Sequence, residues 1–166
     1  MIADTPNSLA TNFELQDIRW PGGRELYEWW DSTRVDKPFP ARRDFSPFEL
    51  TSLLPAIQLI DVGDEERHYS VRLIGTAITE MLGFDPTGKP LDELPGTATV
   101  RKAYDWVVDN QKPIMRLNMP IKWADKDFMT FSALVLPLGP EGQEVNMLLL
   151  HFHFGKLEEG AGNATG

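Results

Sequence analysis

Residues 68–88, HYSVRLIGTAITEMLGFDPTG, constrain the fold more than any other segment of the chain. Apolar side chains alternate over residues 69–73, as in a strand with one buried face, and then recur at helical spacing over residues 77–82. Gly75 stands where the period changes, and the Asp-Pro and Thr-Gly pairs of residues 85–88 mark a turn at the exit. A strand that passes directly into a short helix predicts a small curved sheet with helices folded over one face.

The composition is that of a globular protein with one domain. The 166 residues are 42% hydrophobic and include five Trp and nine Phe, which is enough apolar material for a core. The formal net charge is −9 and no block of Lys and Arg is present, so direct binding of nucleic acid is not expected. The absence of cysteine excludes disulfides, thiolate catalysis and cysteine-ligated metal centres.

The first residues of the chain carry neither the basic region nor the apolar region of a signal peptide. No apolar run approaches the ~18 residues that a membrane-spanning helix needs. We therefore expect no membrane insertion and a cytoplasmic location.

Turn and period signals divide the chain into a flexible or irregular segment (1–23), one domain (24–154) and a disordered glycine-rich tail (155–166). Ser46, followed by Pro47, has the spacing of a helix cap. The expected strands cover residues 56–62, 67–75, 115–123, 128–138 and 145–154, and the expected helices cover residues 24–35, 46–54, 76–82 and 97–111, with a helical turn at 90–94.

The strands are expected to form one sheet, because a hairpin and a three-strand meander are each too small to be stable alone. The helices between the second and third strands then cover one face of that sheet. In the third strand, Met115 and Leu117 fall on one face, and Arg116 and Asn118 fall on the other. The predicted fold class is α+β: a five-stranded antiparallel sheet with helices over one face and an N-terminal helical extension.

This order of elements resembles that of a PAS domain, and in particular a stand-alone PAS-type family common in alphaproteobacteria. The family often carries a second acid where this chain has Ser46, but serine keeps the capping role. The resemblance implies a signalling or regulatory protein, and it implies no particular ligand. The stretches that carry it are ELYEWW (25–30), PARRDFSPFELTSLLPAIQLIDV (40–62), YSVRLIGTAITEMLGFDPTG (69–88), LVLPLG (134–139) and MLLLHF (147–152).

Aromatic and polar side chains near the predicted helices suggest a small-molecule cavity between helices and sheet. The alternative is that the aromatic residues form a filled core. No cofactor is predicted, and a small ligand stays open. The residues expected to line such a cavity are Tyr69, Arg72, Thr76, Phe84, Tyr104 and Trp123.

His151 and His153 lie two residues apart on the last strand and therefore share a face. As a metal site the pair lacks a third ligand, and the long helix at 97–111 contains no histidine of the kind that ligates haem in PAS domains. Haem-binding and flavin-binding sensors are kept as alternatives, although the flavin adduct of light-sensing PAS domains needs a cysteine. We expect both histidines to pack beside the N-terminal helix.

Trp29 and Trp30 are adjacent on the first predicted helix, about 100° apart around its axis. One ring can therefore face the sheet while the other points outward as an interface anchor. Together with His151 and His153, this pair is the predicted interaction surface. The alternative is that both rings pack on the outer face of the sheet.

Two functions follow from the sequence. The first is a non-enzymatic PAS sensory or regulatory module that acts by protein–protein interaction, as a homodimer and with a protein partner in a signalling pathway, with or without gating by a small ligand. The second is a cone-shaped α+β enzyme of the isomerase or dehydratase type, which needs a buried acid in the cavity. Asp61 is the candidate acid.

Overall fold

A computed structural model gives the fold and describes residues 8–63, 68–94, 97, 99–121, 129–141 and 144–156. Its centre is one antiparallel sheet of six described strands, in the order β1-β4-β5-β6-β2-β3. The α+β class is confirmed, with the hairpin and the meander joined through the β2–β6 pair. The strands are β1 Ser8–Ala10, β2 Ile57–Val62, β3 Tyr69–Ile74, β4 Ile114–Pro120, β5 Met129–Leu138 and β6 Met147–Lys156.

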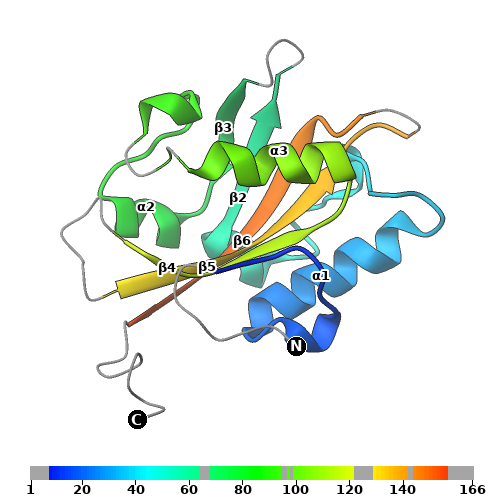
Figure 1. Cartoon of the computed structure of the whole chain (residues 1–166), viewed down its shortest axis with the longest axis horizontal. Helices are drawn as coiled ribbons and strands as arrows, with labels where there is room; N and C mark the ends of the chain where they lie inside the picture. Colours follow the sequence, from blue (N-terminus) through cyan, green and yellow to red (C-terminus); the bar gives the residue numbers. More distant parts are fainter. Residues whose placement is uncertain are drawn as a thin grey trace.

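Helices lie on both faces of this sheet (Figure 1). α2 and α3 cover the face on which the sequence placed them, and α1 packs against β5 and β6 from the opposite side. The α-helices are α1 Pro21–Arg34, α2 Thr76–Leu82 and α3 Val100–Asn110, and the short 3₁₀ helices are η1 Leu15–Asp17, η2 Arg42–Asp44, η3 Thr51–Ala56 and η4 Leu91–Glu93.

Two predicted helix starts need correction. The Trp20–Gly23 stretch was expected to end an irregular segment, but Pro21 occupies the first turn of α1. Proline suits that position, because the first N–H groups of a helix have no partner within the helix. The helix expected to begin at Ser46 is a turn, with Glu49 N–H donating to Ser46 O at 3.2 Å, and the chain then forms η3. Pro55 lies inside η3 and cannot donate the hydrogen bond that an α-helix needs there.

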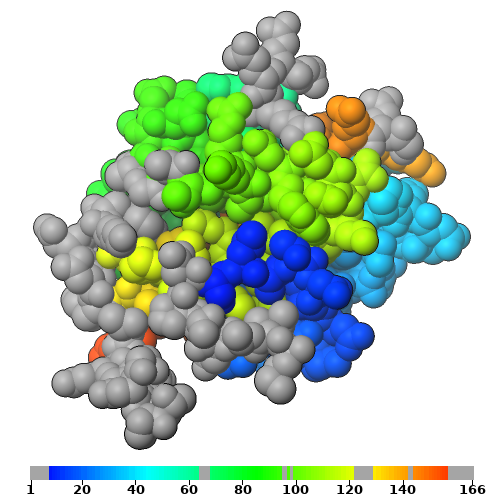
Figure 2. Space-filling view, viewed as in Figure 1, coloured from blue at the N-terminus to red at the C-terminus, as the bar shows by residue number. Residues whose placement is uncertain are grey.

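β1 is a strand that the sequence does not reveal. The first 23 residues were predicted to be flexible or irregular, yet Ser8–Ala10 pair with β4 through the register Leu9 with Arg116. Figure 2 shows this N-terminal segment, in blue, lying against α3 on the surface of the molecule. β1 therefore covers the edge of β4 that a five-stranded sheet would leave open.

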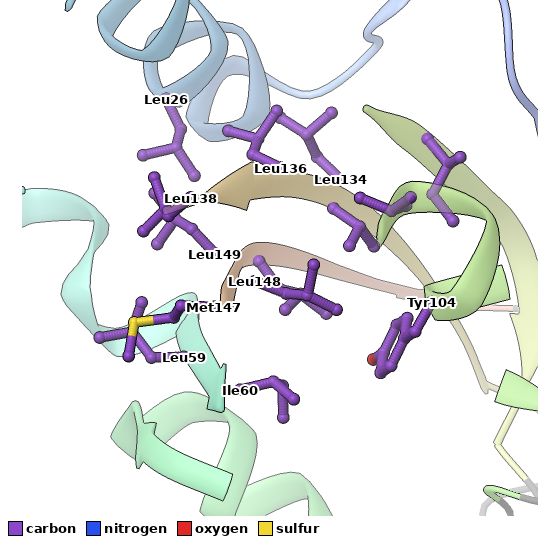
Figure 3. Close-up of a cluster of buried hydrophobic side chains, with 14 of the residues drawn as sticks. Leu26, Leu59, Ile60, Tyr104, Leu134, Leu136, Leu138, Met147, Leu148 and Leu149 are labelled. Carbon is purple, nitrogen blue, oxygen red and sulfur yellow. The ribbon is translucent and has the colours of Figure 1, made fainter. Parts of the chain in front are cut away.

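The two sheet faces bury different side chains, as the alternation of a strand requires. Figure 3 shows Leu136 and Leu138 of β5 on the same side as Leu26 of α1, and Leu148 of β6 on the side of Tyr104 of α3. All five side chains are at most 3% exposed. Because both faces are covered, the central strands are buried throughout, and even their polar side chains lie in the interior.

A β-bulge interrupts β4. The β4–β5 register shifts between Arg116 and Met119, and Asn118 takes a left-handed backbone conformation with φ 53°. Arg116 pairs with Ala133 and Met119 pairs with Phe131, so both face the side of α2 and α3. The simple alternation predicted for this strand, with Met119 opposite to Arg116, is therefore wrong beyond residue 117.

Candidate functional site

A cavity of about 80 Å³ lies between the sheet and the helices α2 and α3. Most of its wall is apolar, and Phe84, which is 37% exposed, stands on its rim. The volume is well below the roughly 300–1,000 Å³ of pockets that enclose drug-sized ligands, so the space suits a small molecule. The described lining residues are Gln58, Ile78, Met81, Leu82, Phe84, Pro86, Leu91, Leu94, Thr97, Val100, Tyr104, Arg116, Phe131, Phe152 and Phe154.

Three of these side chains bring strong hydrogen-bonding groups into the cavity wall: Gln58 of β2, Tyr104 of α3 and Arg116 of β4. Each is at most 8% exposed, although glutamine and arginine are seldom buried in proteins. The register explains why Gln58 is buried: it pairs with Leu150 of β6 and lies on the face that α2 and α3 cover. The arrangement matches a ligand site, where apolar walls surround a few polar groups.

Arg116 is the electrostatic centre of the cavity. Its guanidinium carbon lies 5.5 Å from the centroid of the Phe131 ring, within the range of a cation–π contact. Burial lowers the pKa of Arg116, and the neighbouring Tyr104 oxygen acts in the opposite direction. Burial raises the pKa of Tyr104, so its hydroxyl stays protonated at neutral pH and can donate a hydrogen bond.

The connection before α3 closes one end of the cavity. Thr97, the first residue of the helix expected at 97–111, lies before α3, and its hydroxyl is within hydrogen-bond distance of Leu91 O at 2.7 Å and Leu94 O at 2.9 Å. Thr99 occupies the N-cap position without a side-chain capping bond. Thr97 therefore ties down the backbone of Leu91 and Leu94, two residues that line the cavity.

The structure brings only part of the predicted pocket together. Phe84 and Tyr104 line the cavity, and Tyr69 supports it from behind, with its ring edge-on to Tyr104 at 5.5 Å between centroids. The Tyr69 hydroxyl donates to Asp105 Oδ1 at 2.6 Å. Trp123 lies outside the described residues.

Arg72 and Thr76 were wrongly assigned to the pocket. Arg72 alternates with the buried Tyr69 and Val71 side of β3, and its side chain is 62% exposed and paired with Asp61 at 2.7 Å. Thr76 is exposed in the first turn of α2. The Asp61–Arg72 pair also removes Asp61 from consideration as a cavity acid, because its charge is held at the surface.

The predicted interaction surface is also wrong in two of its four residues. Trp30 is 1% exposed and its indole N–H donates to Pro137 O at 2.9 Å. His151 is 6% exposed and its Nδ1 accepts a hydrogen bond of 3.0 Å from the indole N–H of Trp20. His153 is exposed and stacks on Trp20 at 6.0 Å between ring centroids.

Both histidines therefore pack beside the start of α1, as expected from the sequence. The tryptophan that they contact is Trp20, which lies in the segment predicted to be flexible or irregular (1–23). Gly22 lies against the His151 ring and leaves no room for a side chain. The described residues contain no group of three or more His, Cys, Asp or Glu side chains able to hold a metal ion.

Among the cavity residues that were not predicted from the sequence, Gln58 and Arg116 are the two buried polar ones. The predicted alternation placed Arg116 on the face opposite to Met115 and Leu117, but alternation alone cannot tell whether a helix covers that face. The available signal was a polar residue inside an otherwise apolar strand, as in AIQLIDV (56–62). Such a residue indicates a polar contact in the interior once the strand is known to be central.

The family to which the chain belongs follows from its match to a known family of domains. A family model described as a PAS domain matches residues 18–150, from just before α1 to the middle of β6. The chain belongs to the PAS domain family. A search of curated proteins found no match to the chain. In the described part of this PAS domain, no helix is both long and apolar enough to cross a bilayer.

Proposed function

We propose that this PAS domain is a non-enzymatic sensory module that takes up a small molecule in the cavity between the sheet and α2–α3 and signals by contact with a protein partner. Membership of the PAS family gives the general role, that of a sensory or regulatory module. The observation that carries the finer proposal is the cavity, in which Gln58, Tyr104 and Arg116 interrupt an apolar wall. A domain that only docked to a partner would need no buried polar groups beside a cavity, because burying a polar group without a hydrogen-bond partner destabilises the fold.

Contacts of α2 support a route from the cavity to the surface. Ile78, Met81 and Leu82 of α2 line the cavity. At the start of the same helix, Gly75 lies against the backbone carbonyl of Leu54 in η3, so tightly that a side chain there would clash. A ligand that displaces α2 is therefore expected to displace η3 with it. Such coupling between the cavity and η3 requires that the ligand binds more tightly to the protein with α2 in one position than in the other.

The contact surface that we propose lies around the turn before η3. Phe48 in this turn is 90% exposed and Val35 at the end of α1 is 73% exposed. Trp29, which remains partly exposed, packs edge-on against Phe45 at 5.6 Å between centroids, three residues before Phe48. Exposed aromatic residues of this kind are typical anchors of protein interfaces. This surface replaces Trp30 and His151 in the interaction hypothesis, and the expected homodimer stays a prediction.

The cavity proposal is tested by a thermal-shift screen of small organic acids, amides, amines and alcohols against the wild type and Val100→Phe. Val100 lines the cavity and is 3% exposed, so a phenylalanine there fills the space. We expect some compounds to raise the melting temperature of the wild type without affecting the variant. Compounds that stabilise both proteins equally do not bind in the cavity, and a screen in which all hits behave in this way contradicts the proposal.

The contact proposal is tested with Phe48→Ser, analysed by sedimentation velocity over a range of concentrations. The side chain is exposed, so its loss is expected to leave the far-UV circular dichroism spectrum unchanged while weakening self-association. Glu49→Ser, at the exposed neighbouring residue, is the matched control. Equal self-association in both variants and the wild type would show that this turn does not mediate a homodimer.

A further inference from the structure

The cavity wall carries a charge opposite to that of the whole chain. Arg116 is the only Asp, Glu, Lys or Arg among the described lining residues, whereas the sequence has a formal net charge of −9. Arg116 is 8% exposed, which makes it more than nine-tenths buried. A guanidinium group keeps its proton even in the interior of a protein, so the cavity contains a permanent positive charge.

Within the described part of the chain, no carboxylate neutralises this charge. The ion pairs formed there involve Arg34, Lys37, Arg72 and Arg101, and none involves Arg116. The Phe131 ring face compensates only in part, because a cation–π contact is weaker than a hydrogen-bonded ion pair. A buried cation without a counter-ion destabilises the protein, and a ligand anion would remove this cost.

The register of β4 places Arg116 on the side of α2 and α3, because Arg116 pairs with Ala133 immediately before the β-bulge. The shift of register begins at Arg116, and the backbone N–H of Asn118 donates to Ser132 Oγ at 3.0 Å, which anchors the irregular part of β4 to β5. Beyond the bulge, Met119 pairs with Phe131 and therefore lies on the same face as Arg116. The Gln58 amide and the Tyr104 hydroxyl line the same cavity, so further donors for an anion are present beside the guanidinium.

We propose that the ligand of this cavity is a small monocarboxylate, whose carboxylate pairs with Arg116 and whose apolar body lies against α2 and the phenylalanines of β5 and β6. The inference rests on the proposed function, because it names the chemical class that the cavity takes up. The fork of N–H groups on a guanidinium matches the two oxygens of a carboxylate. A second carboxylate would be buried without a cation, and the volume of about 80 Å³ limits the body to one ring or a short aliphatic chain.

Isothermal titration calorimetry with matched probes tests this proposal. The acids are benzoate and butanoate, their neutral counterparts are benzamide and butanamide, and succinate adds a second carboxylate. We expect at least one of the two monocarboxylates to bind the wild type at least tenfold more tightly than its amide and more tightly than succinate. In Arg116→Met the monocarboxylate is expected to lose at least tenfold in affinity, while the amide is unaffected.

Arg72→Met is the matched control, because Arg72 is an exposed arginine that lies outside the cavity lining and pairs with Asp61. It removes the same charge from the chain and is expected to leave carboxylate binding unchanged. Circular dichroism establishes that each variant is folded, and Arg116→Gln replaces Arg116→Met in all comparisons if the methionine variant does not fold.

The outcomes separate this inference from the function beneath it. Amides that bind the wild type as tightly as the acids, or carboxylate binding that survives in the folded Arg116 variant, overturn anion recognition and leave the ligand-binding cavity intact. If no acid or amide binds and the thermal-shift screen also finds no cavity ligand, the proposed function fails together with the inference. Loss of carboxylate binding in Arg72→Met as well as in the Arg116 variant also overturns the inference, because the net charge of the protein, and not Arg116, would then account for the binding.

Discussion

Trp29 and Trp30 offer the sharpest test of the structure, because adjacent residues of the same type are assigned opposite roles. Trp30 is 1% exposed, donates its indole N–H to Pro137 O at 2.9 Å, and has the Arg34 guanidinium 4.7 Å from its ring centroid. Trp29 is only partly buried, and the edge-on contact with Phe45 is its one ring pair in the described structure.

The expected losses follow from these surroundings. Replacing a fully buried tryptophan with alanine costs about 3–5 kcal/mol, a large share of the roughly 5–15 kcal/mol that stabilise a domain. For Trp29→Ala we expect about 1 kcal/mol, since an aromatic pair contributes about 0.5–1.5 kcal/mol and the ring keeps contact with water. Trp30→Phe keeps an aromatic ring but leaves the Pro137 carbonyl without its donor, which costs about 1–3 kcal/mol.

Urea unfolding followed by far-UV circular dichroism measures these differences without relying on the fluorescence of the altered tryptophans. The midpoints are expected in the order wild type, Trp29→Ala, Trp30→Phe and Trp30→Ala, from most to least stable. An equal or larger loss for Trp29→Ala than for Trp30→Ala would refute the assignment of the two faces of α1. Wild-type stability in Trp30→Phe would refute the role of the indole hydrogen bond.

Three further predictions concern other parts of the fold. Burial lowers the pKa of His151 to about 4 from 6.5, so the unfolded chain binds a proton that the folded chain does not as the pH falls through this range. The contribution of neutral His151 to the free energy of unfolding is therefore fully present above about pH 6.5, and up to about 3 kcal/mol of it is lost as the pH falls towards 4. Urea titrations at several pH values should find a smaller dependence of stability on pH in His151→Gln. Val35 has φ 51° and ψ −109°, which a β-branched residue adopts only under strain, so Val35→Gly should raise the stability by about 0.5–1 kcal/mol and Val35→Ala by less, as the urea midpoint reports. Gly75→Ala should cost about 1–3 kcal/mol, because the new methyl group meets backbone rather than a movable side chain. Thermal unfolding should show a larger loss than for Gly155→Ala, where the new methyl group has room, only if the α2–η3 contact is as tight as described.

The sequence predicts well those elements whose hydrophobic period is local and uninterrupted. The helix expected over residues 76–82 has the bounds of α2, and the strand expected over 56–62 differs from β2 by one residue. In both, the apolar spacing and the flanking Gly or Pro describe the same element, so independent local signals agree. β1 has no such signal, because three residues are too few to show a period and their pairing with β4 depends on the completed sheet.

The candidate site shows a different limit of sequence reasoning. Phe84 and Tyr104 could be predicted because aromatic side chains favour apolar surroundings, which Tyr104 finds in the interior and Phe84 at the rim of the cavity. Arg116 could not, because the alternation of β4 gives only two faces and polarity alone assigns the arginine to solvent. One tertiary fact reverses that assignment: α2 and α3 cover the face on which Arg116 pairs with Ala133, so the arginine lies in the cavity wall.

The position of Arg116 also explains why a polar residue in a strand need not be a fault in the core. A sheet covered on both faces must bury every side chain of its central strands, and a sequence optimised for packing alone would place apolar residues at all of them. Gln58 and Arg116 break this pattern at the one described cavity that both of them line, on strands that come from the hairpin and from the meander. Two departures from separate parts of the chain that meet at one space are better explained by what occupies that space than by the needs of the fold.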